Sequence, residues 1–243
     1  MKPMAESPRA VLFDLGNTLV AYYRATDFAP NLRESIDSIC DFLAERKSVI
    51  VERERAFKRA LQLNVEDPSH RVRPLRNRLV DIFSDQVLSD GDLCAMCDVF
   101  LGPIFRTGRI DAHALPTLAA IRQRGIRTAI VSNTPWGSSA EQWAHEIQRH
   151  GLADAVDAIV FCVDVGWRKP APQIFQRTLS LLDVEARHSV FVGDDPHWDV
   201  AGAVRSGLRP ILLDPRGAVV DTTCPTIQSL TGLLPLLDAM TAE

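Results

Sequence analysis

The strongest constraint on the fold is a set of five short apolar segments, the later ones separated by stretches of helix length. The segments are residues 10–14, 127–133, 157–162, 188–194 and 209–214. They are rich in β-branched residues and form nearly continuous apolar runs, which is typical of strands buried on both faces. Helical patterns occur near residues 138–150, 171–183 and 198–206. This alternation predicts an α/β fold with a doubly wound parallel sheet.

The connection between the first two apolar segments is far longer than a strand crossover requires. Between residues 22 and 110 it contains four helical patterns and no clear strand, at 32–47, 54–63, 75–88 and 93–105. We therefore expect a core domain of residues 1–21 and 111–243 and an inserted helical domain of residues 22–110. Residues 215–226 are rich in turn formers, and a final apolar helix is expected over 227–240.

Composition narrows the classes of partner. The 243 residues carry a formal net charge of -4, which argues against a general affinity for nucleic acid. No segment approaches the roughly eighteen apolar residues of a membrane span, and the first residues lack the apolar core of a signal peptide. The five cysteines are scattered and odd in number, which suits a reducing compartment. We expect a cytoplasmic protein without nucleic-acid or membrane partners.

Polar residues stand where the predicted strands end. They are Asp14, Ser132, Asn133, Asp194 and Asp195, with Lys169 after the third segment. By themselves the aspartates, Ser132 and Asn133 are typical of turns or helix caps, and Lys169 is typical of a solvated lysine. Because ligands bind beyond the carboxyl ends of parallel strands, these residues are expected to converge at one edge of the sheet. Carboxylates, a hydroxyl and an ammonium group at one place indicate a phosphate site with Mg²⁺.

Four segments resemble, in order, the four motifs of the haloacid dehalogenase-like hydrolase superfamily. They are FDLGNTLV (13–20), VSNT (131–134), RKPAPQIF (168–175) and VFVGDDPHWDVAGAVRSG (190–207). The resemblance covers about residues 8–215, and the helical insert lies where that superfamily places a type 1 cap. It implies a Rossmann-like core and hydrolysis of a small phosphorylated metabolite. Asp14 would attack phosphorus to form an aspartyl-phosphate, which water then hydrolyses.

The resemblance also implies a role for each site residue. Mg²⁺ would be bound by Asp14, the Gly16 carbonyl and Asp194. Lys169 and Ser132 would act in catalysis. The phosphate would be contacted by Ser132, Asn133, Lys169 and Gly16. Asp199 would orient the surroundings of the metal or Lys169, and Asp195 is a second candidate for that task.

One residue departs from the family pattern. Most phosphatases of the family carry a second aspartate at the position of Gly16, where it protonates the leaving oxygen. A positioned general acid commonly contributes about 10² to 10⁴ in rate. Three interpretations follow: a substrate that leaves readily or brings its own acid, a slow phosphatase with an acid from the cap, or a catalytically weakened protein that binds phosphate or a partner. A metal-free 2-haloacid dehalogenase is a further alternative, against which the intact GDDPHWD segment argues.

The predicted cap is rich in arginine. Its arginines include Arg24, Arg33, Arg71, Arg73, Arg76 and Arg78. The segment HRVRPLRNR (70–78) could grip an anionic substrate through bidentate contacts. A solvated helix face interrupted by a proline is the favoured interpretation. Trp136, just after VSNT, is expected to be either a wall of the site or a hydrophobic plug.

Overall fold

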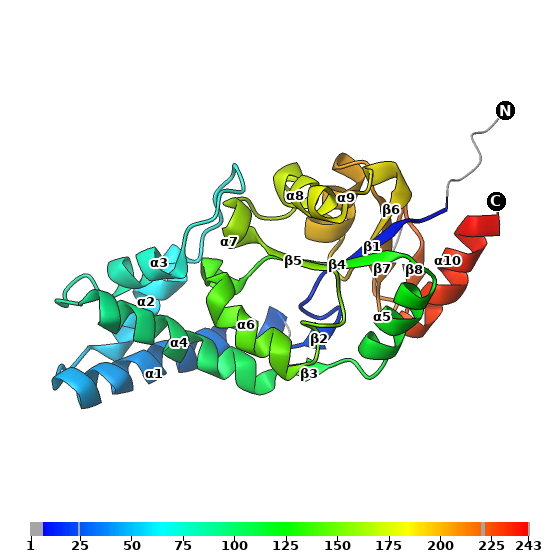
Figure 1. The fold of residues 1–243 in the computed structure, drawn as a ribbon. Helices are drawn as coiled ribbons and strands as arrows, with labels where there is room; N and C mark the ends of the chain where they lie inside the picture. Colours follow the sequence, from blue (N-terminus) through cyan, green and yellow to red (C-terminus); the bar gives the residue numbers. More distant parts are fainter. Residues whose placement is uncertain (1–6, 24, 220–221, 243) are drawn as a thin grey trace.

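The computed structural model describes residues 7–23, 25–219 and 222–242. In this part of the chain a six-stranded parallel sheet has the order β5-β4-β1-β6-β7-β8. The strands are β1 (Ala10–Phe13), β4 (Arg127–Ser132), β5 (Ala158–Phe161), β6 (Ser189–Gly193), β7 (Arg209–Leu213) and β8 (Thr226–Ile227). The predicted α/β fold is confirmed, and every apolar segment that predicted a strand contains one (Figure 1).

Helices cover both faces of the sheet. They are α5 (Ala114–Gln123), α6 (Ala140–Arg149), α8 (Pro172–Leu182), α9 (Ala201–Arg205) and α10 (Leu233–Ala242). Val11 and Phe13 share an apolar cluster with α5, α6 and α10. Ala10 and Leu12, which alternate with them, share another with α8 and α9. Strand β1 is therefore buried on both sides, and its end brings the following residue to the carboxyl edge of the sheet.

The helical insert has its own apolar core. It consists of α1 (Phe28–Lys47), α2 (Arg53–Leu63), α3 (Leu75–Ile82) and α4 (Asp90–Thr107), between the short strands β2 (Val20–Ala21) and β3 (Arg109–Ile110). Ile36, Leu79 and Phe100 belong to this second core. The chain enters the insert through β2 and leaves it through β3, and these two strands pair antiparallel. Figure 1 shows the insert at the end of the molecule away from both chain termini.

Three features differ from the sequence expectations. Helix α3 was expected over 75–88 but ends at Ile82, and a new helix starts after the Ser89 cap. The last helix was expected from residue 227 but begins at Leu233. Ile227 instead belongs to β8 and pairs with Leu213 of β7. Helix α5 and the pair of β2 and β3 were not predicted. Two-residue strands are determined by pairing with distant segments, which no local pattern reveals.

Short helical turns complete the chain. They are η1 (Ala25–Asp27), η2 (Pro135–Gly137), α7 (Cys162–Val165), η3 (Ala186–His188), η4 (Pro196–Val200) and η5 (Leu230–Gly232). In η2, Trp136 is buried in the apolar core of the insert, with its ring 5.3 Å from that of Phe100. This burial favours the hydrophobic plug of the two interpretations of Trp136. In the described residues, no helix has the length and apolar character needed to cross a membrane.

Candidate active site

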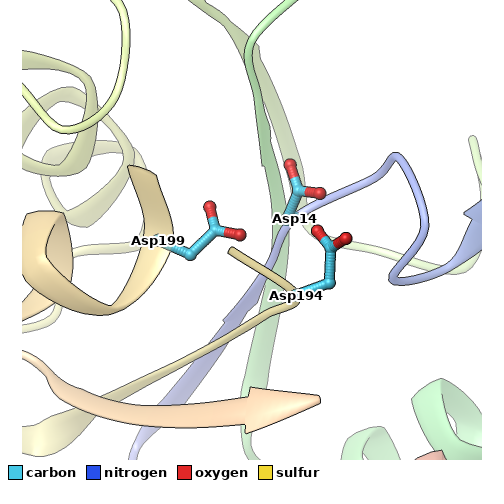
Figure 2. A group of neighbouring side chains, drawn as sticks. All are labelled: Asp14, Asp194 and Asp199. Carbon is cyan, nitrogen blue, oxygen red and sulfur yellow. The ribbon is translucent and has the colours of Figure 1, made fainter. Parts of the chain in front are cut away.

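The candidate site lies at the carboxyl edge of the sheet. Asp14 follows β1, Ser132 ends the neighbouring strand β4, and Asp194 follows β6 on the other side. Because these strands are adjacent and parallel, their ends meet at one place. Figure 2 shows the carboxylates of Asp14 and Asp194 side by side, with that of Asp199 turned toward them from the start of a helix. The sequence expectation that the strand ends converge therefore holds for these residues.

Lys169 forms the centre of the buried charges. Its Nζ lies 2.5 Å from Asp14 Oδ1 and 2.7 Å from Asp199 Oδ1, and the residue is only 1% exposed. Burial by itself lowers the pKa of Lys169, but the charges of Asp14 and Asp199 outweigh it and raise the pKa above its ordinary value. The side chain is thus an ammonium ion at neutral pH, placed against the carboxylate expected to attack phosphorus.

The three carboxylates crowd one another. One oxygen of each of Asp14, Asp194 and Asp199 lies within 4.8 Å of the others. Burial and the charges of Asp14 and Asp199 raise the pKa of Asp194 to about 8. Burial also raises the pKa of Asp199, although Lys169 opposes this. One ammonium group does not balance three carboxylates, and carboxylate oxygens are preferred ligands of Mg²⁺. The residues therefore fit a hard divalent cation.

Asn133 and Asp195 make contacts that the sequence did not indicate. The Asn133 side chain accepts a hydrogen bond from Lys169 N at 2.8 Å and donates one to Lys169 O at 3.1 Å. It therefore braces the main chain of the lysine. Asp195 Oδ1 accepts from His197 N and Trp198 N, both at 2.7 Å, and so caps η4. The Asp195 N–H donates to Asp199 Oδ2 at 3.1 Å, which fixes the orientation of Asp199.

Sequence reasoning missed Thr18. Its hydroxyl donates to Asp14 Oδ2 at 3.5 Å, and the residue is buried. The spacing of four residues between Asp14 and Thr18 is the signal that could have revealed it, since a tight turn brings the two together. In that turn Val20 N donates to Leu15 O at 2.9 Å. Thr18 therefore helps to hold the side chain of Asp14 in place.

The backbone conformation at position 16 does not require a glycine. Its φ lies outside the left-handed region that favours glycine. A Cβ added there would have Tyr22 Cδ2 as its nearest neighbour, at 3.9 Å, which is ordinary van der Waals contact. A Cβ is therefore tolerated at this position, so the turn does not by itself impose a glycine.

Most of the arginines named from the sequence form ion pairs or hydrogen bonds with other residues of the insert. Ion pairs join Arg33 to Glu54, Arg73 to Asp81 and Arg76 to Asp90. Arg78 is buried and donates to main-chain carbonyls, whereas the Arg71 guanidinium lies 4.4 Å from the centroid of the Trp167 ring. Arg24 lies outside the described residues. The pairs of Arg33, Arg73 and Arg76 agree with the interpretation of a charged outer face, whereas the buried Arg78 does not belong to it.

Comparison with known proteins agrees with this geometry. The chain is 32% identical over 226 residues to a ribulose-1,5-bisphosphate 5-phosphatase of Halopiger xanaduensis, covering 85% of this chain and 84% of the relative. It is 25% identical to a glyceraldehyde 3-phosphate phosphatase of Pyrococcus abyssi, over 84% of this chain and 80% of the relative. Both relatives are thus matched over most of their length.

A solved structure shares the fold over nearly the whole chain. It is a 2-haloacid dehalogenase of Pseudomonas syringae, with a TM-score of 0.69 and 26% identity, covering 96% of this chain and 98% of that protein. The family model described as haloacid dehalogenase-like hydrolase matches residues 8–207. These residues include all four motif segments and the acidic cluster at the sheet edge. The chain therefore belongs to the haloacid dehalogenase-like hydrolases.

Proposed function

We propose that this protein is a Mg²⁺-dependent phosphatase that hydrolyses a small phosphorylated metabolite through an aspartyl-phosphate at Asp14. The observation that carries the proposal is the buried Lys169, bonded to Asp14 and Asp199 beside Asp194. Two relatives named as phosphatases of ribulose 1,5-bisphosphate and glyceraldehyde 3-phosphate support a small phosphorylated substrate.

In the first step an oxygen of the Asp14 carboxylate attacks phosphorus. The bond from phosphorus to the leaving oxygen breaks, and its electron pair goes to that oxygen. Lys169 lies against Asp14 and offsets the repulsion between the carboxylate and the phosphate. The Ser132 hydroxyl, at the end of β4, would donate to a phosphoryl oxygen, and Asn133 keeps Lys169 in place.

In the second step water attacks phosphorus of the aspartyl-phosphate. Inorganic phosphate leaves and the Asp14 carboxylate is restored. Asp14, Asp194 and the Gly16 carbonyl would hold Mg²⁺, which supplies positive charge next to the phosphate when it is bound. Asp199 keeps Lys169 directed at the site through the contact of 2.7 Å. Asp195 in turn supports Asp199 through its main-chain N–H.

The leaving oxygen receives no proton from position 16. We therefore favour a substrate whose leaving group departs with little proton donation, such as an acyl, aryl or anomeric oxygen, rather than the primary alkyl oxygen of the phosphates in the two relatives' names. The space beside Gly16 supports this choice of substrate. A Cβ would fit there, so the glycine is not required by steric crowding. An acid supplied by the cap would give aryl and alkyl phosphates similar rates, whereas catalysis weakened in favour of binding would lower the rates of both.

A metal-free 2-haloacid dehalogenase is the second candidate. It is favoured by the structural similarity to a protein of that name and by the absence of an acid at Gly16. The crowded carboxylates of Asp14, Asp194 and Asp199 argue for the phosphatase, because they fit a cation that the dehalogenase reaction does not use.

One experiment separates these functions. Phosphate release from p-nitrophenyl phosphate is measured with Mg²⁺ and with a chelator, and chloride release from 2-chloropropionate is measured beside it. The phosphatase releases phosphate only with Mg²⁺ and releases no chloride. Chloride release without metal would establish the dehalogenase, and neither activity would leave a binding protein.

Two further proposals concern the domains and the location. We propose that residues 22–110 form the cap and that residues 1–21 and 111–243 form the catalytic core. The apolar core of α1 to α4, separate from those of the sheet, supports this division. We also propose a cytoplasmic location, which is supported by the five free cysteine thiols.

A further inference from the structure

The loop between α2 and α3 is held closed at its base by one side chain. Arg78, which is 2% exposed, donates from Nη1 to Leu63 O and to Val65 O, the latter at 3.5 Å. Its Nε donates to Arg73 O at 3.4 Å, on the other limb of the loop. Burial lowers the pKa of Arg78, and its Nη1 and Nε donate to these three main-chain carbonyls. We name residues 64–73 the strap.

The strap is bonded to the core through main-chain atoms. Arg71 and Trp167 form an antiparallel bridge. Val72 N donates to Gly166 O at 3.1 Å, and Arg168 N donates to His70 O at 2.8 Å. In Figure 1 the strap is the cyan loop that rises from the insert toward α7. The insert therefore binds the residues that immediately precede Lys169.

An ion pair crosses the same boundary. Arg168 Nη1 lies 3.0 Å from Glu66 Oε1, and the Arg168 side chain is 13% exposed. The guanidinium also lies 5.8 Å from the ring centroid of Trp198. The His70 ring of the strap packs edge-on at 6.1 Å from the same tryptophan. Trp198 directly precedes Asp199, so Arg168 contacts both the strap and the segment that holds the second partner of Lys169.

From these contacts we propose that the docked strap positions Lys169 for catalysis, and that Arg168 is the positioning residue that transmits its docking. The main chain of Lys169 is fixed on one side by Asn133 and on the other by residues 166–168. The insert thereby acts on the lysine through the residues that precede it in the chain. When the strap leaves its place, Gly166 O and Arg168 N lose their hydrogen-bond partners, and Lys169 loses one of its two supports. This inference rests on the proposed role of Lys169 in phosphate hydrolysis.

The test breaks the crossing ion pair and compares it with one that stays within the insert. Glu66→Gln removes the partner of Arg168, whereas Arg73→Gln removes an ion pair between the same loop and Asp81 of α3. We expect Glu66→Gln to lower kcat about fivefold with less change in KM, because Lys169 acts mainly in the transition state. Arg73→Gln should leave both constants within about twofold. Arg168→Lys, which keeps the charge, should retain more activity than Arg168→Gln.

Hydrogen exchange gives a readout that does not depend on activity. The Arg168 amide donates to His70 O and should exchange about fivefold faster in Glu66→Gln than in the wild type, with no such change in Arg73→Gln. Unchanged kcat and exchange in Glu66→Gln, or equal effects of the two variants, would overturn the proposal. Asp81→Asn breaks the same control ion pair as Arg73→Gln from its other side. Equal kinetics and exchange in these two variants would show that the control result does not come from misfolding of one of them. A wild type that hydrolyses no phosphate ester would instead refute the proposed function, and the exchange rates would still show whether the ion pair holds the strap.

Discussion

Charged side chains are arranged in opposite ways at the sheet edge and on the helical insert. At the edge, Lys169 and Asp199 are 1% and 2% exposed and 2.7 Å apart. On the insert, the side chains of Arg33 and Glu54 are 35% and 52% exposed while forming a pair of similar length. Water screens the exposed pair, which therefore contributes little to folding or function. Charges that remain buried and crowded despite their desolvation cost are typical of a functional site.

The largest expected effect tests this contrast directly. Asp14→Asn should lower kcat for a phosphate ester by at least about 10³-fold, because the nucleophile is lost while the shape is kept. Glu54→Gln, which breaks the exposed pair with Arg33, should change kcat by less than about twofold. Steady-state kinetics of both variants, with circular dichroism to verify folding, provide the measurement. If Asp14→Asn keeps most of its activity, the edge is not the catalytic site.

The next effect concerns the missing acid beside Asp14. In the wild type, aryl phosphates should react about 10² times faster than alkyl phosphates of similar size, because Gly16 donates no proton. Gly16→Asp should raise the alkyl rate selectively, since its Cβ has room at 3.9 Å from Tyr22. Gly16→Asn has nearly the same shape without the acid and serves as the control. Equal aryl and alkyl rates in the wild type would show that another group already donates the proton.

A third comparison separates two adjacent aspartates at the edge. Asp194→Ala should weaken Mg²⁺ binding by more than about tenfold, because the cation loses a charged ligand. Asp195→Ala should change Mg²⁺ affinity much less and instead lower the free energy of unfolding by about 1 kcal/mol, because it removes the cap of η4. Titration calorimetry and thermal unfolding distinguish the two. Unchanged Mg²⁺ affinity in Asp194→Ala would rule out this ligand.

The smallest expected effect is a difference between the two regions in how their carboxyl groups make the folding stability depend on pH. In the metal-free protein the pKa of Asp194 is about 8, against an ordinary 3.8, so between these values the folded state binds more protons than the unfolded state. Its contribution to stability therefore falls as the pH rises from about 4 to about 8. In the insert, hydrogen bonds from Lys47 and Ser89 lower the pKa of Asp92, so its contribution is lost on acidification below about pH 4.

Thermal unfolding with a chelator present tests these directions. The melting temperature should fall by about 5 °C between pH 5 and pH 8, and Asp194→Asn should remove most of that fall. Mg²⁺ should restore the loss at pH 8, since it binds the charged carboxylates. Asp92→Asn should leave the behaviour between pH 5 and pH 8 unchanged. A wild-type melting temperature that is level from pH 5 to pH 8 would contradict the account of Asp194.

The sequence was sufficient for five of the six strands of the sheet and for the gathering of the site residues. Continuous apolar runs can only be buried between two layers of helices, which makes the parallel sheet the natural arrangement. Once the strands are parallel, their ends share an edge, so the meeting of Asp14, Asp194 and Lys169 follows from their place after the strands. These inferences use only local patterns and one general rule of topology.

Tertiary structure alone decided the partners of these groups. Asn133 is 36 residues from Lys169, yet it braces the lysine main chain, and the Arg168 partner Glu66 comes from another part of the fold. The edge strand β8 likewise exists because β7 offers it hydrogen bonds. Such choices depend on which surfaces meet after folding. A sequence pattern states which residue types are present and how far apart they lie, but a hydrogen bond between distant segments depends on distances and angles that only the packed chain sets.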